Sequence, residues 1–152
     1  MMFCALLGPL CVIAATGAPD VTDDAKALQG LWLRVELESD GKRLIKDEIW
    51  GGPLQMFVKG AEMWIGKDAS KEIGRHKTFK FDSAKSPKQL DLTSHDGQEN
   101  GQTAAAIYKL EDGRLTICMP YFTTDPSTRP TEFKTKPGDT LMILVFERAA
   151  AK

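Results

Sequence analysis

The sequence has few cysteines, no excess of charge of one sign and no apolar run long enough to cross a membrane as a helix. It contains 3 Cys in 152 residues, and its 20 basic and 21 acidic side chains give a net charge of -1. Without a basic excess, the chain has no electrostatic footprint for nucleic acid or an anionic membrane surface. With 42% hydrophobic and 27% charged residues, the composition excludes collagen-like, disordered and multi-span membrane proteins and indicates one globular domain.

Charged side chains are missing altogether from residues 1–17. The apolar run Phe3–Ala15 has the length of a signal-peptide core, and small residues precede Ala18, as cleavage there requires. We therefore predict a signal peptide at 1–17, a single mature domain at 18–152, and an exported protein, periplasmic or secreted, that keeps no membrane span. The alternative is that these residues form a buried N-terminal strand or helix.

Removal of the signal peptide would leave Cys118 as the single cysteine of about 135 residues. An internal disulfide is then impossible, and a hydrophobic core has to stabilise the domain. Cys118 stands in the apolar stretch Leu115–Met119, whereas a nucleophilic thiolate needs an electropositive, partly exposed place. We expect it to be a small buried hydrophobe.

Alternating apolar and polar residues dominate the rest of the chain. Residues 20–28 predict a short helix with Thr22 as its N-cap. The alternation predicts eight strands separated by short turns, at 31–39, 54–60, 61–67, 74–82, 89–93, 103–110, 114–119 and 140–148. No long amphipathic helix separates them, which excludes a parallel βαβ sheet. The fold class is therefore all-β, an antiparallel up-and-down barrel of about eight strands or, alternatively, a sandwich.

Two segments interrupt this regularity. Residues 44–53 are irregular, with one possible helical turn. Residues 120–139 contain four prolines, and a connection of this length is usually functional or contains another strand, for which Thr131–Thr135 is the candidate. On strand 31–39, Leu31 and its alternate neighbours share one face, while Trp32, Arg34, Glu36 and Glu38 share the other.

Gly30-Leu31-Trp32, at the start of the first strand, resembles the Gly-x-Trp signature of lipocalins and related calycin barrels. In that superfamily an Arg or Lys near the end of the last strand packs on the Trp and helps to close the base of the barrel, and Arg148 matches it in position. The resemblance implies that Gly30, Trp32 and Arg148 close the barrel, with a cation–π contact of about 0.5–2 kcal/mol. The alternative is that Trp32 only fills the core.

Several segments in order along the chain are similar to an uncharacterised lipocalin-like domain family abundant in exported proteins of planctomycete bacteria. They are LQGLW (28–32), SPKQLDLT (86–93), AIYKLEDGRLTIC (106–118), RPTEF (129–133) and LVFER (144–148). The resemblance covers about residues 27–149 and implies the barrel fold, but the family has no established activity to transfer. Ala106 departs from the family, which usually has Gly before Ile-Tyr.

Catalytic and metal-binding patterns are missing from the sequence. His76 and His95, the two histidines, do not stand at metal-ligand spacing, and there is no nucleophile elbow, Walker loop or dinucleotide fingerprint. We therefore predict no metal site, no cofactor and no enzymatic activity.

Two functional hypotheses follow. A barrel of this size can hold a small apolar or amphipathic ligand, or its side chains can fill the interior. The candidate lining residues are Phe57, Trp64, Phe79, Phe81, Tyr108 and Met119. Alternatively, the protein binds a partner protein through the 120–139 loop and Trp50, with Tyr121, Phe122, Arg129 and Phe133 as anchors. Arg129 could instead hold the loop down by bonding carbonyl groups. In either case we expect a monomer.

Overall fold

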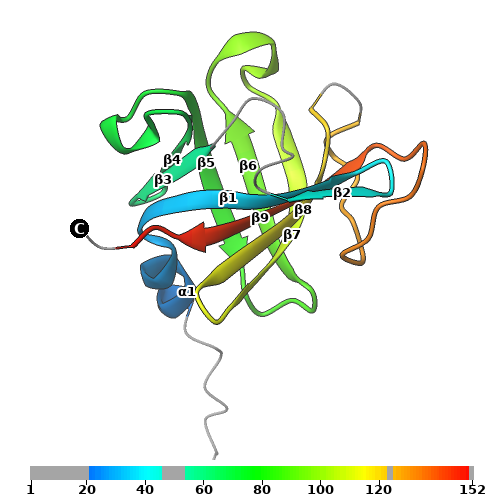
Figure 1. The fold of residues 1–152 in the computed structure, drawn as a ribbon, viewed down its shortest axis with the longest axis horizontal. Coiled ribbons are helices and arrows are strands. Elements are labelled where there is room, and N and C mark those ends of the chain that lie inside the picture. The colour runs from blue at the N-terminus through cyan, green and yellow to red at the C-terminus, as the bar shows by residue number, and fades with distance from the viewer. Residues whose placement is uncertain (1–20, 46–53, 123–124, 151–152) are drawn as a thin grey trace, which may run out of the picture.

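Nine strands and one helix make up most of the computed structural model, which describes residues 21–45, 54–122 and 125–150 (Figure 1). The predicted signal peptide and Trp50 lie outside the described residues. The elements are α1 (Val21–Leu28), β1 (Gly30–Ser39), β2 (Lys42–Ile45), β3 (Gln55–Lys59), β4 (Glu62–Gly66), β5 (Arg75–Asp82), β6 (Lys88–Ser94), β7 (Thr103–Glu111), β8 (Arg114–Pro120) and β9 (Leu141–Arg148), with short 3₁₀ turns at Ala69–Lys71 and Gly97–Glu99. Helix α1 begins at Val21, so Thr22 lies inside its first turn and the prediction of an N-cap there is wrong.

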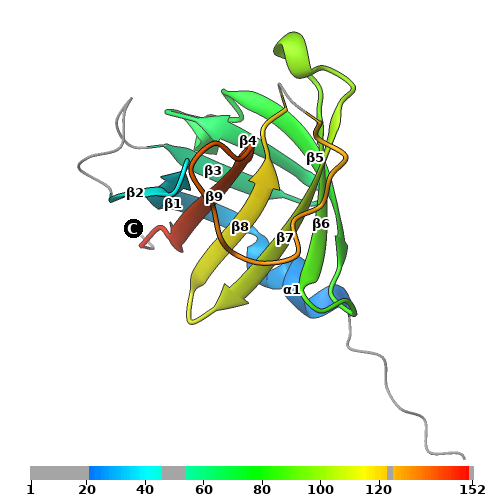
Figure 2. The ribbon, with the colours of Figure 1, turned by 90° about the vertical axis from the view of Figure 1, so that its right-hand side faces the viewer.

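The strands form one antiparallel sheet in the order β2-β1-β3-β4-β5-β6-β7-β8-β9, and β9 pairs back onto β1. Eight strands therefore close into an up-and-down barrel, which confirms the predicted fold class. Strand β2 is the extra one: it pairs with the second half of β1, whereas β3 pairs with the first half (Figures 1 and 2). Residues 42–45 are thus a strand where the sequence predicts irregular chain from residue 44 on.

A β-bulge in β1 changes which side chains point inward. The pairing with β9 shifts register between Arg34 and Glu36. Trp32 and Arg34 pair with inward-facing residues of β9, whereas Glu36 and Glu38 pair with outward-facing ones. The prediction that all four share one face is therefore wrong beyond Arg34, because a bulge inserts one extra residue and reverses the alternation.

The interior of the barrel near α1 is densely filled. Its buried side chains include Trp32, Phe79, Leu90, Leu115 and Leu28 of the helix. Only about 10 Å³ of free space remains among the residues of this half, about the least that a single water molecule needs. The half of the barrel next to α1 is therefore a solid core.

The base of the barrel is closed by contacts between α1 and the first and last strands. The Trp32 indole Nε1 donates a hydrogen bond to the Leu28 carbonyl at 2.8 Å. The Arg148 guanidinium carbon lies 4.5 Å from the centre of the Trp32 ring, and its nitrogens donate to the carbonyls of Ala27 and Gln29. A Cβ on Gly30, where φ is +105°, would lie 3.5 Å from this guanidinium. These contacts have the geometry that the Gly-x-Trp resemblance implies.

A second attachment of the helix involves Asp24, whose carboxylate accepts hydrogen bonds from Tyr108 at 2.6 Å and from Lys88 at 2.8 Å. Burial alone would raise the pKa of Asp24, but the bonds from Lys88 and Tyr108 outweigh it and hold that pKa below its ordinary value. Burial and the nearby Asp24 carboxylate together raise the pKa of Tyr108, so the phenol stays protonated and donates.

Residues 125–139, which we call the strap, cross the outside of the barrel (Figure 2). Phe133 packs on a second apolar cluster on the outer face of β7, β8 and β9, formed by Ile107, Cys118, Ile143 and Val145. The predicted strand at Thr131–Thr135 is absent. The Thr135 amide donates to the Glu38 carboxylate at 3.2 Å rather than to a neighbouring strand. The Ala105 amide of β7 donates to the Pro126 carbonyl of the strap at 2.7 Å, but no β-ladder forms.

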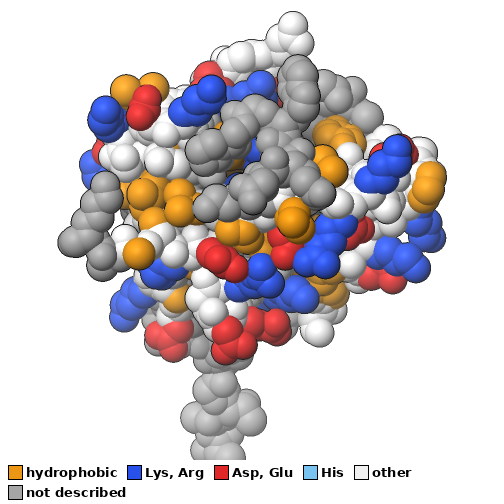
Figure 3. All heavy atoms as spheres, viewed as in Figure 1, with side chains coloured by type: hydrophobic (Ala, Val, Ile, Leu, Met, Phe, Trp, Pro, Cys, Tyr) orange, Lys and Arg blue, Asp and Glu red, His pale blue; other side chains and the backbone are white. Residues whose placement is uncertain are grey.

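The surface carries both signs of charge. On the face seen in Figure 3, blue Lys and Arg side chains are interspersed with red Asp and Glu side chains. Several of these charges pair, as when Arg114 reaches both Glu36 and Glu147 at 3.1 Å. Such exposed pairs contribute little to stability.

Candidate functional site

A cavity of about 460 Å³ occupies the half of the barrel away from α1. Its wall is mostly apolar and comes from the inner faces of the strands. The apolar and aromatic lining consists of Leu54 and Met56, Met63 and Ile65, Leu92, Ile117 and Met119, Tyr121 and Phe122, and Met142, Leu144 and Phe146. The cavity exceeds the lower size of about 300 Å³ that is typical of small-molecule sites.

The two halves of the barrel differ in side-chain type. Apart from Met63, aromatic and branched residues border the filled half next to α1, whereas four of the twelve uncharged residues that line the cavity are methionines. Methionine is unbranched and has three rotatable bonds, so its side chain adapts to differently shaped neighbours. The cavity therefore lies between the densely packed half of the barrel and a methionine-rich lining whose side chains can adapt in shape.

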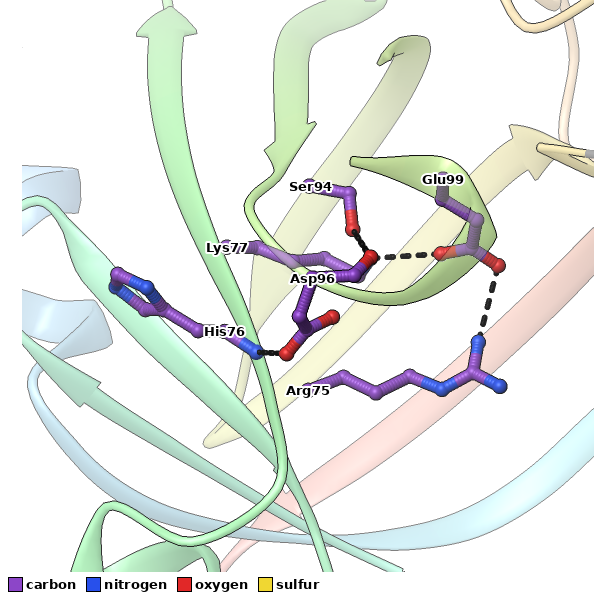
Figure 4. Close-up of polar contacts among 6 residues, drawn as sticks. All are labelled: Arg75, His76, Lys77, Ser94, Asp96 and Glu99. Carbon is purple, nitrogen blue, oxygen red and sulfur yellow. Dashed lines mark hydrogen bonds and ion pairs between the residues drawn. The ribbon is translucent and has the colours of Figure 1, made fainter. Parts of the chain in front are cut away.

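Charged groups gather at the side of the cavity where β5 begins and β6 ends (Figure 4). Lys77 is only 4% exposed, and its Nζ lies 3.1 Å from Ser94 Oγ and 3.2 Å from Glu99 Oε2. The other oxygen of Glu99 accepts from Arg75 at 3.0 Å. The Lys77 ammonium also lies 4.2 Å from the centre of the Phe122 ring. Lys77 is thus buried together with a counter-charge, a hydroxyl and an aromatic face.

The turn that carries Glu99 is held by its neighbours. The His76 amide donates to Asp96 Oδ2 at 2.7 Å, and Ser94 Oγ donates weakly to the Asp96 carbonyl at 3.4 Å (Figure 4). These bonds fix the 3₁₀ turn at Gly97–Glu99 against β5, which places the Glu99 carboxylate between Arg75 and Lys77.

Arg34, on β1, is the next inward-facing residue after Trp32 and lines the cavity. Its Nε is buried without a hydrogen-bond partner. Within the described part of the chain, no carboxylate pairs with its guanidinium. Burial lowers the pKa of Arg34 from its ordinary value, because an apolar surrounding disfavours the charged form.

The residues predicted to line a ligand site fall into three places. Met119 lines the cavity, while Phe79 and Phe81 border the filled half. Tyr108 is buried in the core, with its hydroxyl bonded to Asp24. Phe57 and Trp64 lie on the outer face and do not line the cavity.

The outer position of Phe57 and Trp64 follows from the strand register. Phe57 and Trp64 pair with each other, between cavity-lining or core residues on either side. Trp64 stacks on His76 with ring centres 5.1 Å apart, and His76 lies at the same distance from His95. Every position from 56 to 58 and from 63 to 65 is apolar, so alternation could not tell which of these residues face inward.

The predicted loop anchors contact their own barrel. Tyr121 and Phe122 line the cavity, and Phe133 packs on the outer cluster. Arg129 donates to the Ala106 carbonyl at 2.5 Å and also reaches Asp91 Oδ1 at 2.5 Å. Its geometry matches the alternative in which it holds the loop down by bonding carbonyls.

Sequence reasoning missed Arg34, Lys77, Ser94 and Glu99 as cavity or rim residues. A signal for one of them was present. Lys77 has the same strand parity as Phe79 and Phe81, so it is a cation on an otherwise apolar face. Arg34 shares the parity of Trp32, but Glu36 and Glu38 share it too, so the alternation alone assigns Arg34 to a polar face. Glu99 lies in a turn, and only the fold brings it to Lys77.

Among the described residues, no three His, Cys, Asp or Glu side chains gather as metal ligands would, and no helix is long and apolar enough to cross a membrane. Comparison with protein families finds no match to this chain, and comparisons with curated proteins and with solved structures find none either.

Proposed function

We propose that this protein is an exported, monomeric and non-catalytic barrel that binds a small apolar or amphipathic molecule in its cavity. The cavity itself carries the proposal, because about 460 Å³ of mostly apolar space is large enough for a small molecule, and a ligand there would remove that apolar surface from water. The likeness of the Gly30, Trp32 and Arg148 contacts to those of lipocalin-like barrels supports the same role.

The reactive side chains of the described residues support binding rather than catalysis. Cys118 is fully buried on the outer cluster, and burial raises its pKa to about 11, so little thiolate forms near neutral pH. Lys77 is paired with Glu99, and a paired ammonium is a poor base for the neighbouring hydroxyl of Ser94. The two histidines lie outside the barrel, away from the cavity.

The strap gives less support to a partner-binding role. Its aromatic and cationic anchors are used within the fold, since Phe133 covers the outer cluster and Arg129 donates to backbone carbonyls of Leu90 in β6 and Ala106 in β7. We therefore base the proposal on the cavity.

Filling the cavity tests the proposal. Met142→Trp places a large ring in the cavity, whereas Ile73→Trp adds the same ring at a position that is 58% exposed and outside it. We expect a small neutral fluorescent probe such as 1-aminonaphthalene to bind the wild type and Ile73→Trp equally, and Met142→Trp at least tenfold more weakly. Both variants should keep the wild-type far-UV circular dichroism spectrum.

Native mass spectrometry of protein purified from its own host is the second readout. It should show a bound small molecule on the wild type and on Ile73→Trp, and a smaller bound fraction on Met142→Trp. Equal probe binding by all three proteins, with no bound molecule in the spectra, would contradict the proposal.

A further inference from the structure

The charges that line the cavity do not cancel. Three cations, Arg34, Arg75 and Lys77, face one carboxylate, Glu99, among the described residues. Glu99 lies between Arg75 and Lys77, at 3.0 Å from one and 3.2 Å from the other (Figure 4). The described lining residues therefore carry a positive surplus, and the side chain among them that Glu99 does not reach is Arg34.

Arg34 is placed unusually for an arginine in a barrel interior. It rises from the inner face of β1, directly after the fully buried Trp32 and beside Phe146 of β9. Its guanidinium borders apolar wall, and its Nε is buried without a partner. A cation in such a place is costly unless an anion or an acceptor joins it. Its planar fork of donors matches the two oxygens of a carboxylate.

The volume of the cavity limits the size of the ligand that can bind beside Arg34. A water molecule occupies about 30 Å³ in liquid water, and a small chemical group needs a similar volume. A cavity of about 460 Å³ therefore holds roughly 10–15 non-hydrogen atoms. The methionine-rich wall can pack against a flexible chain, because its side chains adapt in shape.

We propose that the cavity binds a single-chain amphipathic anion, an alkyl carboxylate of about eight to twelve carbons, with its carboxylate on Arg34 and its chain along the methionine-lined wall. This assignment rests on the proposed binding function and specifies the ligand class. Decanoate is the matching probe. Decanol has the same chain with a neutral head, and decyltrimethylammonium has the same chain with a positive head.

Isothermal titration calorimetry with the three probes on the lipid-free protein tests the assignment. We expect decanoate to bind the wild type at least tenfold more tightly than decanol, and decyltrimethylammonium to bind most weakly. Arg34→Gln should reduce the decanoate-to-decanol preference to less than about threefold while leaving decanol affinity nearly unchanged. Arg34→Lys should keep part of the preference.

Arg43→Gln is the matched control. Arg43 is an exposed arginine on β2 that pairs with Glu36 at 2.6 Å outside the barrel, so its loss should leave the preference intact. Far-UV circular dichroism and melting temperature monitor folding, and Arg34→Met is the second variant if Arg34→Gln does not fold. The comparison of probes on the wild type needs no variant at all.

The outcomes separate the two proposals. Binding of none of the probes would refute the binding function itself. Equal binding of decanol and decanoate to the wild type would overturn the carboxylate assignment and leave the binding function standing. A preference for decanoate over decanol that survives in Arg34→Gln would place the carboxylate at another cation. This result would also overturn the assignment to Arg34.

Discussion

Replacing Arg148 by alanine removes one side chain that joins the last strand, the first strand and the helix. The guanidinium stacks on Trp32 with its carbon 4.5 Å from the ring centre, and it donates to the carbonyls of Ala27 and Gln29. A cation–π contact at an exposed site contributes about 0.5–1 kcal/mol. Each charged hydrogen bond, reduced for solvent exposure, adds up to about 1 kcal/mol.

We therefore expect Arg148→Ala to lower the free energy of unfolding by about 2 kcal/mol. For a domain of this size that corresponds to a fall in melting temperature of about 6 °C. Thermal unfolding followed by far-UV circular dichroism measures it, and urea titration gives the free energy directly. Arg148→Lys keeps the charge over the ring but not the forked donation, so its loss should be about half as large.

Arg114→Ala is the matched control, because Arg114 is also exposed and reaches two carboxylates but no aromatic ring and no backbone carbonyl. Its removal should cost less than about 1 kcal/mol. Equal losses for Arg148→Ala and Arg114→Ala would refute the reasoning, since they would show that the contacts with Trp32 and the helix carbonyls add nothing beyond surface charge.

Three further predictions concern other parts of the molecule. The pKa of Asp24 in the folded protein lies below the ordinary pKa of an aspartate. The ionised carboxylate therefore stabilises the fold at pH values above the ordinary pKa, and this stabilisation is lost as the pH falls through the folded pKa. Urea titrations should show the wild type losing more stability than Asp24→Asn from about pH 5 to about pH 3. Cys118, with a pKa of about 11 and no exposed surface, should resist iodoacetamide in the folded state at neutral pH and react on unfolding, with peptide mass spectrometry as the readout; rapid native labelling would contradict its burial. Arg129→Ala should loosen the strap and speed hydrogen exchange of the Ala105 amide, which donates to the Pro126 carbonyl at 2.7 Å; unchanged exchange would show that the strap stays in place without the arginine.

Much of the fold could be predicted because one barrel face is apolar and the turns contain glycine. The hairpin between β7 and β8 is an example: Asp112 and Gly113 both have positive φ, as the tight turn requires, and the sequence Glu-Asp-Gly predicts it. The bulge at Arg34 could not be predicted, because nothing in a regular alternation marks where an extra residue enters.

The candidate site was less accessible to sequence reasoning for two reasons. In β3 and β4 both strand faces carry apolar residues, so Phe57 and Trp64 could be assigned to either side. Whether a barrel is hollow depends on how large side chains meet across it, and no local pattern records that. The pairing of Lys77 with Glu99 joins residues 22 positions apart and depends on where one turn folds back.

The pairing of β1 with β9 also has a consequence for how the chain reaches its native state. Every other neighbouring pair in the barrel joins strands that are consecutive in sequence or separated only by the short β2. The pairing that turns the sheet into a barrel joins Trp32 to Arg148, near the two ends of the described chain. Until β9 has paired with β1 and β8, both of these strands have unpaired edges, and such edges favour association with other chains. We expect the formation of this last and most distant contact to limit the rate of folding.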